Sequence, residues 1–124
     1  MNIVLADREA EIMEVLWDLG PSTVTEVQQR VSDELAYTTV LTILRNLESK
    51  GYVTHDSAGK AHRYSATVER DAARRSALRA MADKFFKGST AMLLTHLVAD
   101  EKLSPDEVKR VRAVLARRGR KAKP

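Results

Sequence analysis

Hydrophobic residues recur at helical spacing near the N-terminus, and Gly20-Pro21 interrupts the pattern. The spacing predicts a helix over residues 7–19, whose apolar face is formed by Ile12, Val15, Leu16 and Leu19. A second helix of about nine residues is expected to begin after Thr23. Thr23 and Glu26 match the capping box, in which each side chain bonds the backbone amide of the other residue.

A third helix is predicted over residues 37–50, and Gly51 follows as a left-handed cap. Its apolar face consists of Val40, Ile43, Leu44 and Leu47. Its opposite face consists of Thr38, Thr39, Thr42, Arg45, Asn46 and Ser49. These short hydrogen-bonding side chains, with one arginine and almost no acid, suit contact with base edges in the major groove of DNA.

Two extended runs follow, over residues 52–56 and 61–66, and the segment 57–60 between them contains a glycine. This pattern predicts a β-hairpin. Three helices followed by a hairpin form a winged helix-turn-helix, in which the hairpin is the wing. The wing places Lys60, His62 and Arg63 where they could hold phosphates beside the groove.

The rest of the chain predicts further helices, over residues 69–87, around 92–98 and from Ser104-Pro105 onward. We expect a mainly α fold with a small antiparallel β wing. The predicted division is a DNA-binding domain over residues 1–68, a helical dimerisation region over 69–117 and a disordered basic tail over 118–124.

So short a helical region cannot bury all of its apolar side chains against itself, which predicts a homodimer. The expected interface consists of Leu78, Met81, Phe85, Phe86, Leu93, Leu94, Leu97, Val111 and Leu115. Two-fold association would bring the helix over residues 37–50 of each subunit to one side of the duplex, with the two copies about 34 Å apart. This predicts a pseudopalindromic site.

Composition excludes several other classes of protein. There is no cysteine, which rules out disulfides and thiolate metal sites, and the three histidines lack ligand spacing, so no metal or cofactor is expected. No signal peptide, membrane span or catalytic motif is recognised, which predicts a cytoplasmic protein that is not an enzyme. The net charge of +4 is uneven, because residues 1–67 carry six Lys/Arg against ten Asp/Glu.

The chain resembles the BlaI/MecI family of bacterial repressors, which control β-lactamase and related resistance genes. The resemblance covers nearly the whole chain, through the segments REAEIMEVLW, STVTEV, AYTTVLTILRNLESKGYV, AHRYSATV and LSPDEVKRV. It implies a homodimeric repressor on a palindromic operator. In some members a membrane-bound sensor protease releases the repressor by cutting its dimerisation helices.

Site residues follow from the resemblance position by position. Base contact is expected from Thr39 and Thr42, with Thr38 and Arg45 beside them. Backbone contact is expected from Tyr37, Asn46, Lys50, Lys60, His62 and Arg63.

Two positions depart from the family pattern. Asn46 stands where some members carry arginine, and His96-Leu97 stands at the protease-sensitive Asn-Phe bond of the best-known members. Two alternatives remain open: a winged-helix adaptor that binds protein, which the acidic front half favours, and a repressor switched by a small molecule.

Overall fold

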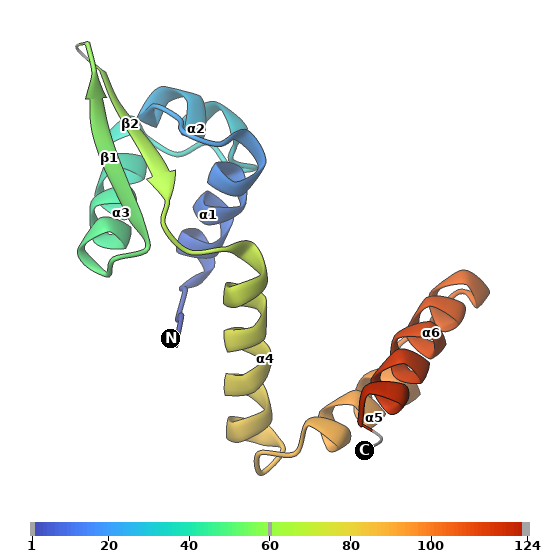
Figure 1. The fold of residues 1–124 in the computed structure, drawn as a ribbon. Helices are drawn as coiled ribbons and strands as arrows, with labels where there is room; N and C mark the ends of the chain where they lie inside the picture. Colours follow the sequence, from blue (N-terminus) through green and yellow to red (C-terminus); the bar gives the residue numbers. More distant parts are fainter. Residues whose placement is uncertain (1, 60, 123–124) are drawn as a thin grey trace. The chain divides into compact units, whose positions relative to one another are not determined.

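The structure of the chain is a computed structural model that describes residues 2–59 and 61–122 (Figure 1). The elements are α1 (Asp7–Leu19), α2 (Val24–Arg30), α3 (Tyr37–Ser49), β1 (Val53–Ala58), β2 (Ala61–Ala66), α4 (Arg70–Phe85), α5 (Thr90–Asp100) and α6 (Pro105–Ala122). The predicted mainly helical fold with a small β wing is confirmed. The chain divides between Ala80 and Met81 into two compact units, which we call the winged-helix unit and the helical unit.

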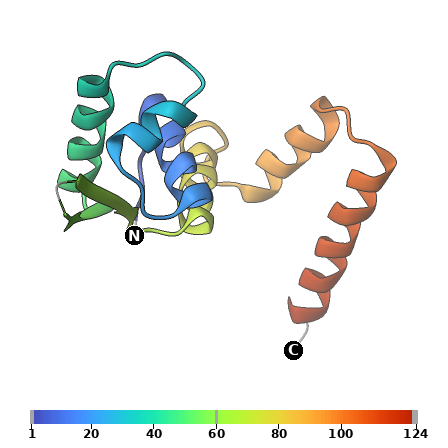
Figure 2. The same cartoon turned by 90° about the horizontal axis from the view of Figure 1, so that it is seen from above.

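The winged-helix unit is built on one hydrophobic core that α1, α2, α3 and the hairpin share. Its largest fully buried apolar side chains are Ile12, Met13, Leu16, Val27, Val40, Leu44 and Leu47. β1 pairs antiparallel with β2, and Ser22 adds an isolated bridge to Tyr64 on the second strand. Figure 2 shows α3 and the hairpin together on one side of this unit. Burial of one face of each helix therefore leaves the other face of α3 available beside the wing.

Several elements differ in length from the predictions. α2 has seven residues rather than about nine, because Val31 leaves the helical conformation. The strands continue to Ala58 and from Ala61, so the loop is tighter than the predicted segment 57–60. Gly59 has a φ of 68°, a left-handed conformation that glycine adopts without steric cost.

The winged-helix unit extends beyond the predicted boundary at residue 68. Trp17 Nε1 donates a hydrogen bond to the carbonyl of Val68 at 2.9 Å, and the amide of Ile3 donates to Ser76 Oγ at 3.1 Å. Ala72 and Ala73 pack against the core. The first turns of α4 therefore belong to the winged-helix unit, whereas sequence reasoning assigned all of this helix to the dimerisation region.

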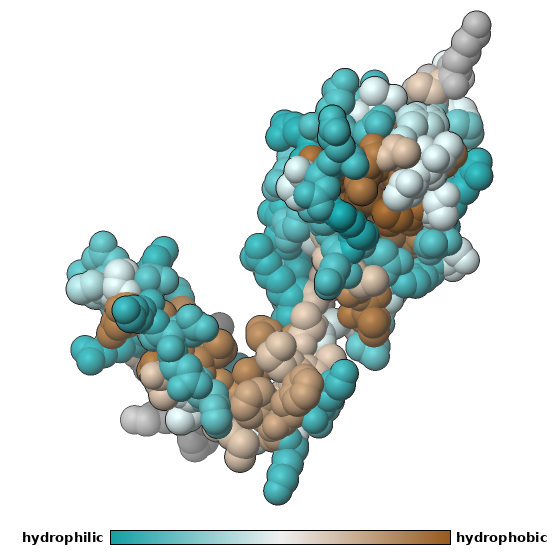
Figure 3. All heavy atoms as spheres, turned by 180° about the vertical axis from the view of Figure 1, so that it is seen from behind, coloured by the Kyte–Doolittle hydropathy of each residue, from teal (hydrophilic) through white to brown (hydrophobic). Residues whose placement is uncertain are grey.

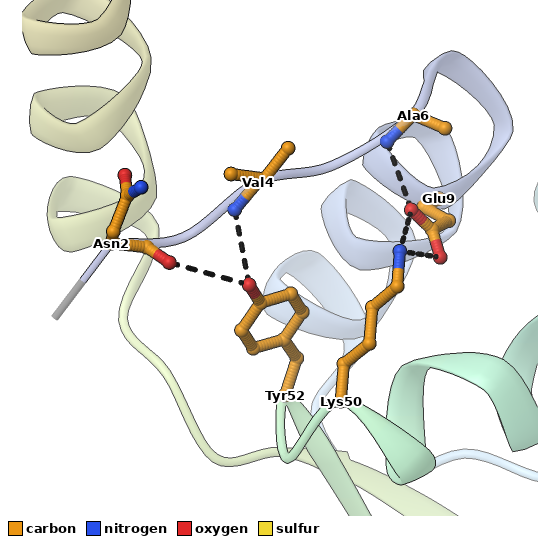
Figure 4. A network of polar contacts seen from close by, with 6 residues as sticks. All are labelled: Asn2, Val4, Ala6, Glu9, Lys50 and Tyr52. Atoms are coloured by element: carbon orange, nitrogen blue, oxygen red, sulfur yellow. Dashed lines mark hydrogen bonds and ion pairs between the residues drawn. The ribbon is translucent and has the colours of Figure 1, made fainter.

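The N-terminal segment is held by a polar network around Glu9 (Figure 4). Lys50 Nζ donates to Glu9 Oε1 at 2.8 Å and Oε2 at 2.7 Å, and the amide of Ala6 donates to Oε1 at 2.9 Å. Tyr52 Oη accepts from the amide of Val4 at 3.0 Å. Burial alone would raise the pKa of Glu9, but Lys50 and the Ala6 amide together hold it below the ordinary glutamate value.

We expect Glu9→Gln to lower the free energy of unfolding by about 1–3 kcal/mol at neutral pH, because it removes the charge of a buried carboxylate that the exposed Lys50 and the Ala6 amide stabilise. A lowered folded pKa adds stability above the ordinary value of 4.5, and this contribution is lost as the pH falls through the folded pKa. The difference in free energy of unfolding between wild type and variant should therefore become smaller in acid. Urea unfolding across pH 3 to 7 measures it.

The control for this experiment is Glu34→Gln, which removes an exposed carboxylate. It should change stability by less than about 0.5 kcal/mol. If Glu9→Gln had an equally small effect at every pH, the network would not stabilise the fold.

The helical unit contains the end of α4 together with α5 and α6. Ser89 Oγ accepts from the amide of Met92 at 3.0 Å and caps α5. Ser104 Oγ accepts from the amide of Glu107 at 3.1 Å, which confirms the predicted start of α6. Hydrophobic side chains lie at the surface of this unit (Figure 3). None of the helices in residues 2–59 and 61–122 is long and apolar enough to span a membrane.

The prediction of a disordered tail over residues 118–124 is wrong as far as Ala122, because α6 continues to that residue. Apart from Gly119, its last turns contain arginine, lysine and alanine, which are good helix formers, and extending an existing helix costs less than nucleating one. Cations at a helix C-terminus also interact favourably with the helix dipole. Residues 123 and 124 lie outside the described residues.

Candidate nucleic-acid interface

The two faces of α3 differ sharply in burial. Val40, Leu44 and Leu47 are fully buried against the rest of the winged-helix unit. The opposite face is exposed along Thr38, Thr39, Thr42, Arg45 and Asn46, and Tyr37 at the start of the helix is also exposed. None of these exposed side chains is acidic, and the helix packs into the core through its buried face. The structure therefore brings together the α3 side chains that the sequence predicted for DNA.

Thr42 has a defined hydroxyl orientation. Its Oγ1 donates to the carbonyl of Thr38 at 2.9 Å, four residues earlier in the helix. A hydroxyl has one proton, so the oxygen has only acceptor capacity left, and the methyl group provides an apolar contact. Thr42 thus suits an amino group of adenine or cytosine, or the methyl of thymine.

A groove of about 410 Å³ separates α3 from the wing and the start of α2. Its lining includes Thr23, Thr25, Tyr37, Arg45, Glu48, His55, His62 and Tyr64. His55 Nδ1 lies 2.7 Å from Glu48 Oε2, which links β1 to α3. The ring of His55 also contacts His62, with centroids 4.8 Å apart, and Tyr64, with centroids 5.3 Å apart. This cluster fixes the wing relative to α3.

Tyr64 is the buried member of this cluster. Burial raises the pKa of its hydroxyl, and the charge of Glu48 adds to this effect, whereas Arg45 opposes it by hydrogen bonding and charge. Tyr64 is therefore a neutral hydroxyl, and Arg45 lies at the boundary between α3 and the wing.

Sequence reasoning missed Glu48 and His55. The signal available was strand alternation, because antiparallel pairing places His55, His62 and Tyr64 on one face of the hairpin.

The predicted phosphate contacts differ in their surroundings. His62 is exposed on β2. Arg63 is also exposed, and its Nη1 lies 3.5 Å from the carbonyl of Pro21 and 3.6 Å from Glu26 Oε1. Lys50 is engaged by the nearly buried Glu9, which favours a role in stabilising the fold over phosphate contact. Lys60 lies outside the described residues.

Most of the predicted dimer residues are exposed in the single chain. The exposed members are Leu78, Met81, Phe85, Leu94, Leu97 and Leu115, while Phe86 and Val111 are half-buried. Leu93 differs, because only 6% of it is exposed. It therefore packs within the chain and leaves little surface for a partner, and its place in the interface stays a prediction.

The predicted cleavage position, His96-Leu97, lies inside α5. The His96 ring contacts Phe86, with centroids 5.3 Å apart, and its Nδ1 lies 3.8 Å from Asp100 Oδ2. The side chain is largely exposed, but the peptide bond belongs to a helix.

Transcription regulators, one of them bound to DNA, are among the solved structures similar to this one. Bacillus licheniformis BlaI, in its monomeric form with the blaP half-operator, aligns with a TM-score of 0.50 at 23% identity, covering 57% of this chain and 89% of that chain. The Staphylococcus aureus regulator MepR aligns with a TM-score of 0.52 at 16% identity, covering 96% of this chain and 81% of that chain. At these identities the similarity establishes the winged-helix fold.

Sequence comparison identifies the family. A Mycobacterium tuberculosis protein named transcriptional regulator BlaI is 35% identical over 116 residues, covering 90% of this chain and 83% of that protein. The Staphylococcus aureus methicillin resistance regulatory protein MecI is 22% identical, covering 90% of this chain and 92% of that protein. The sequence profile of the penicillinase repressor family matches residues 5–117. The chain therefore belongs to the penicillinase repressor family, whose members are transcriptional regulators and not enzymes.

Proposed function

We propose that the chain is a homodimeric repressor that binds a pseudopalindromic DNA operator. The observation that carries this proposal is α3, which has a fully buried apolar face and an exposed face of threonines without acidic residues. Membership of the penicillinase repressor family and the half-operator bound to the similar BlaI structure support it. In this proposal Thr38, Thr39, Thr42 and Arg45 contact bases, and Tyr37, Asn46, His62 and Arg63 contact the DNA backbone.

Selection of bound duplexes from a random pool tests the proposal. We expect enrichment of a two-fold symmetric sequence with half-sites about one helical turn apart, because each subunit places one α3 in the major groove. Enrichment of an asymmetric sequence, or of none, would contradict the proposal. The same selection reports the preferred bases, including the effect of asparagine at position 46.

Arg63→Ala is expected to weaken binding to operator and random duplex by the same factor. Because one phosphate per subunit is then no longer neutralised, the slope of log affinity against log salt should also fall by about 0.9 per subunit. Fluorescence anisotropy at several salt concentrations measures both effects. The control is Arg8→Ala, since Arg8 is already paired with Glu11 at 3.1 Å and Asp33 at 2.7 Å. An unchanged slope for the Arg63 variant would assign Arg63 to the packing of the wing against Pro21.

Release of DNA by proteolysis in α5 is the second part of the proposal. Proteases bind extended backbone, so cleavage at His96-Leu97 requires several turns of α5 to unwind first. Exposure of His96 and the position of this bond within the proposed dimer region support a cleavage site whose cutting separates the two subunits. Incubation with a membrane sensor protease from the same genome, followed by mass spectrometry, would identify the cut bond.

A further inference from the structure

Many cations of the winged-helix unit are already paired with acids. The pairs are Arg8 with Glu11 and Asp33, Lys50 with Glu9, Arg70 with Glu14 and Asp18, and Arg74 with Asp71. Residues 1–67 also contain more Asp/Glu than Lys/Arg. Since the affinity of proteins for DNA depends strongly on neutralising phosphates, this unit alone provides little of that charge.

The helical unit contains a basic surface on α6. Lys109, Arg112 and Arg117 are exposed. At 100° per residue they lie outside the arc of the half-buried Val108 and Val111, on the side that also contains the exposed Asp106 in the first turn. The ion pairs found among the described residues include none of these three cations, whereas Arg110 lies beside the charge of Glu107. We call Lys109, Arg112 and Arg117 the α6 basic face.

We propose that the α6 basic face binds phosphates of duplex DNA without reading base sequence. The proposal rests on the DNA-binding function proposed above and adds a second attachment surface to it. Charge complementarity supports DNA, since the three cations of this face on each subunit meet a partner that carries one negative charge per about 1.7 Å.

An anionic membrane surface is the competing partner for a basic amphipathic helix. The apolar side of α6 contains valines and one leucine but neither tryptophan nor phenylalanine, which helices lying in a membrane interface commonly carry. The charge of α6 therefore matches the phosphates of a duplex better than its apolar side matches lipid.

The test compares wild type with the variant Lys109→Gln/Arg112→Gln/Arg117→Gln. Glutamine keeps helix propensity while it removes charge. We expect the variant to bind the selected operator and a random duplex more weakly by the same factor, so that their ratio is unchanged. The slope of log affinity against log salt should fall by about 0.9 for each phosphate that the variant no longer neutralises. Circular dichroism and sedimentation verify the fold and the oligomeric state.

The matched control is Lys84→Gln/Lys87→Gln/Lys102→Gln, which removes the same charge from exposed positions of the helical unit outside α6. It should leave the salt slope unchanged. If the salt slope fell equally in both variants, the effect would be one of net charge alone, which would overturn the proposal.

Other outcomes separate this proposal from the proposed function. If wild type binds the operator and the α6 variant has the same salt slope, the α6 proposal fails and the repressor function stands. If wild type binds neither duplex, both fail. If α6 substitution leaves DNA binding intact but abolishes flotation with phosphatidylserine vesicles, the basic face binds lipid instead.

Discussion

Phe85→Asp is expected to convert the proposed dimer into a monomer that folds but no longer binds the operator tightly. Phe85 is 68% exposed in the single chain, so the substitution costs little in the monomer. In an apolar interface, however, an unpaired carboxylate is strongly unfavourable. Because linking two half-site contacts raises affinity by about 100-fold or more, separation of the subunits should lower operator affinity by at least that factor.

Sedimentation equilibrium at micromolar concentration measures the oligomeric state, and anisotropy measures binding to a full operator and a half-site. Leu97→Asp should act in the same way, since Leu97 is also exposed and apolar. Thr95→Asp places the same charge at an exposed polar position of α5 and should leave the dimer intact. Intact dimers of both Phe85→Asp and Leu97→Asp would show that these side chains lie outside the subunit interface.

The elements that depend on interactions between residues close in the sequence were predictable. α1 and α3 follow from apolar periodicity, and the start of α2 follows from a capping box that the structure contains, with Thr23 accepting from the Glu26 amide at 3.2 Å. The same periodicity separated the two faces of α3, because a helix with one apolar stripe must bury that stripe. The composition of the exposed face then indicated DNA.

The features that sequence reasoning missed depend on contacts between distant residues. Lys50 meets Glu9 across 41 positions of the chain, and no local pattern distinguishes such a lysine from one that contacts phosphate. Periodicity likewise shows that Leu93 and Leu97 belong to an apolar helix, but it does not show which side chain the chain itself covers. The boundary near Ala80 depends on the packing of α4 against the core, which the composition of α4 does not reveal.

The tail of α6 was misjudged for a different reason. Basic composition without apolar periodicity is typical of disordered tails. Here the residues before Arg117 already form a helix, and the basic residues after it are good helix formers.

Thr39→Ala and Thr42→Ala are each expected to lower the free energy of specific binding by about 1–3 kcal/mol while non-specific binding stays nearly constant. Both side chains are exposed on α3, so their removal leaves the core intact. For Thr42 the structure allows a finer expectation, because its proton is donated to the Thr38 carbonyl. Thr42→Val keeps the methyl group without the oxygen, and Thr42→Ser keeps the oxygen without the methyl group.

Anisotropy titrations on the selected operator and on random duplex distinguish these contacts. Retained specificity in the valine variant identifies a thymine methyl as the contact, and retained specificity in the serine variant identifies an amino group. The matched control is Thr95→Ala, because Thr95 is also an exposed helical threonine, whose hydroxyl donates to the Ala91 carbonyl at 2.8 Å. Equal reductions on operator and random duplex would exclude Thr39 and Thr42 as base contacts, since a side chain that reads sequence must affect the two duplexes differently.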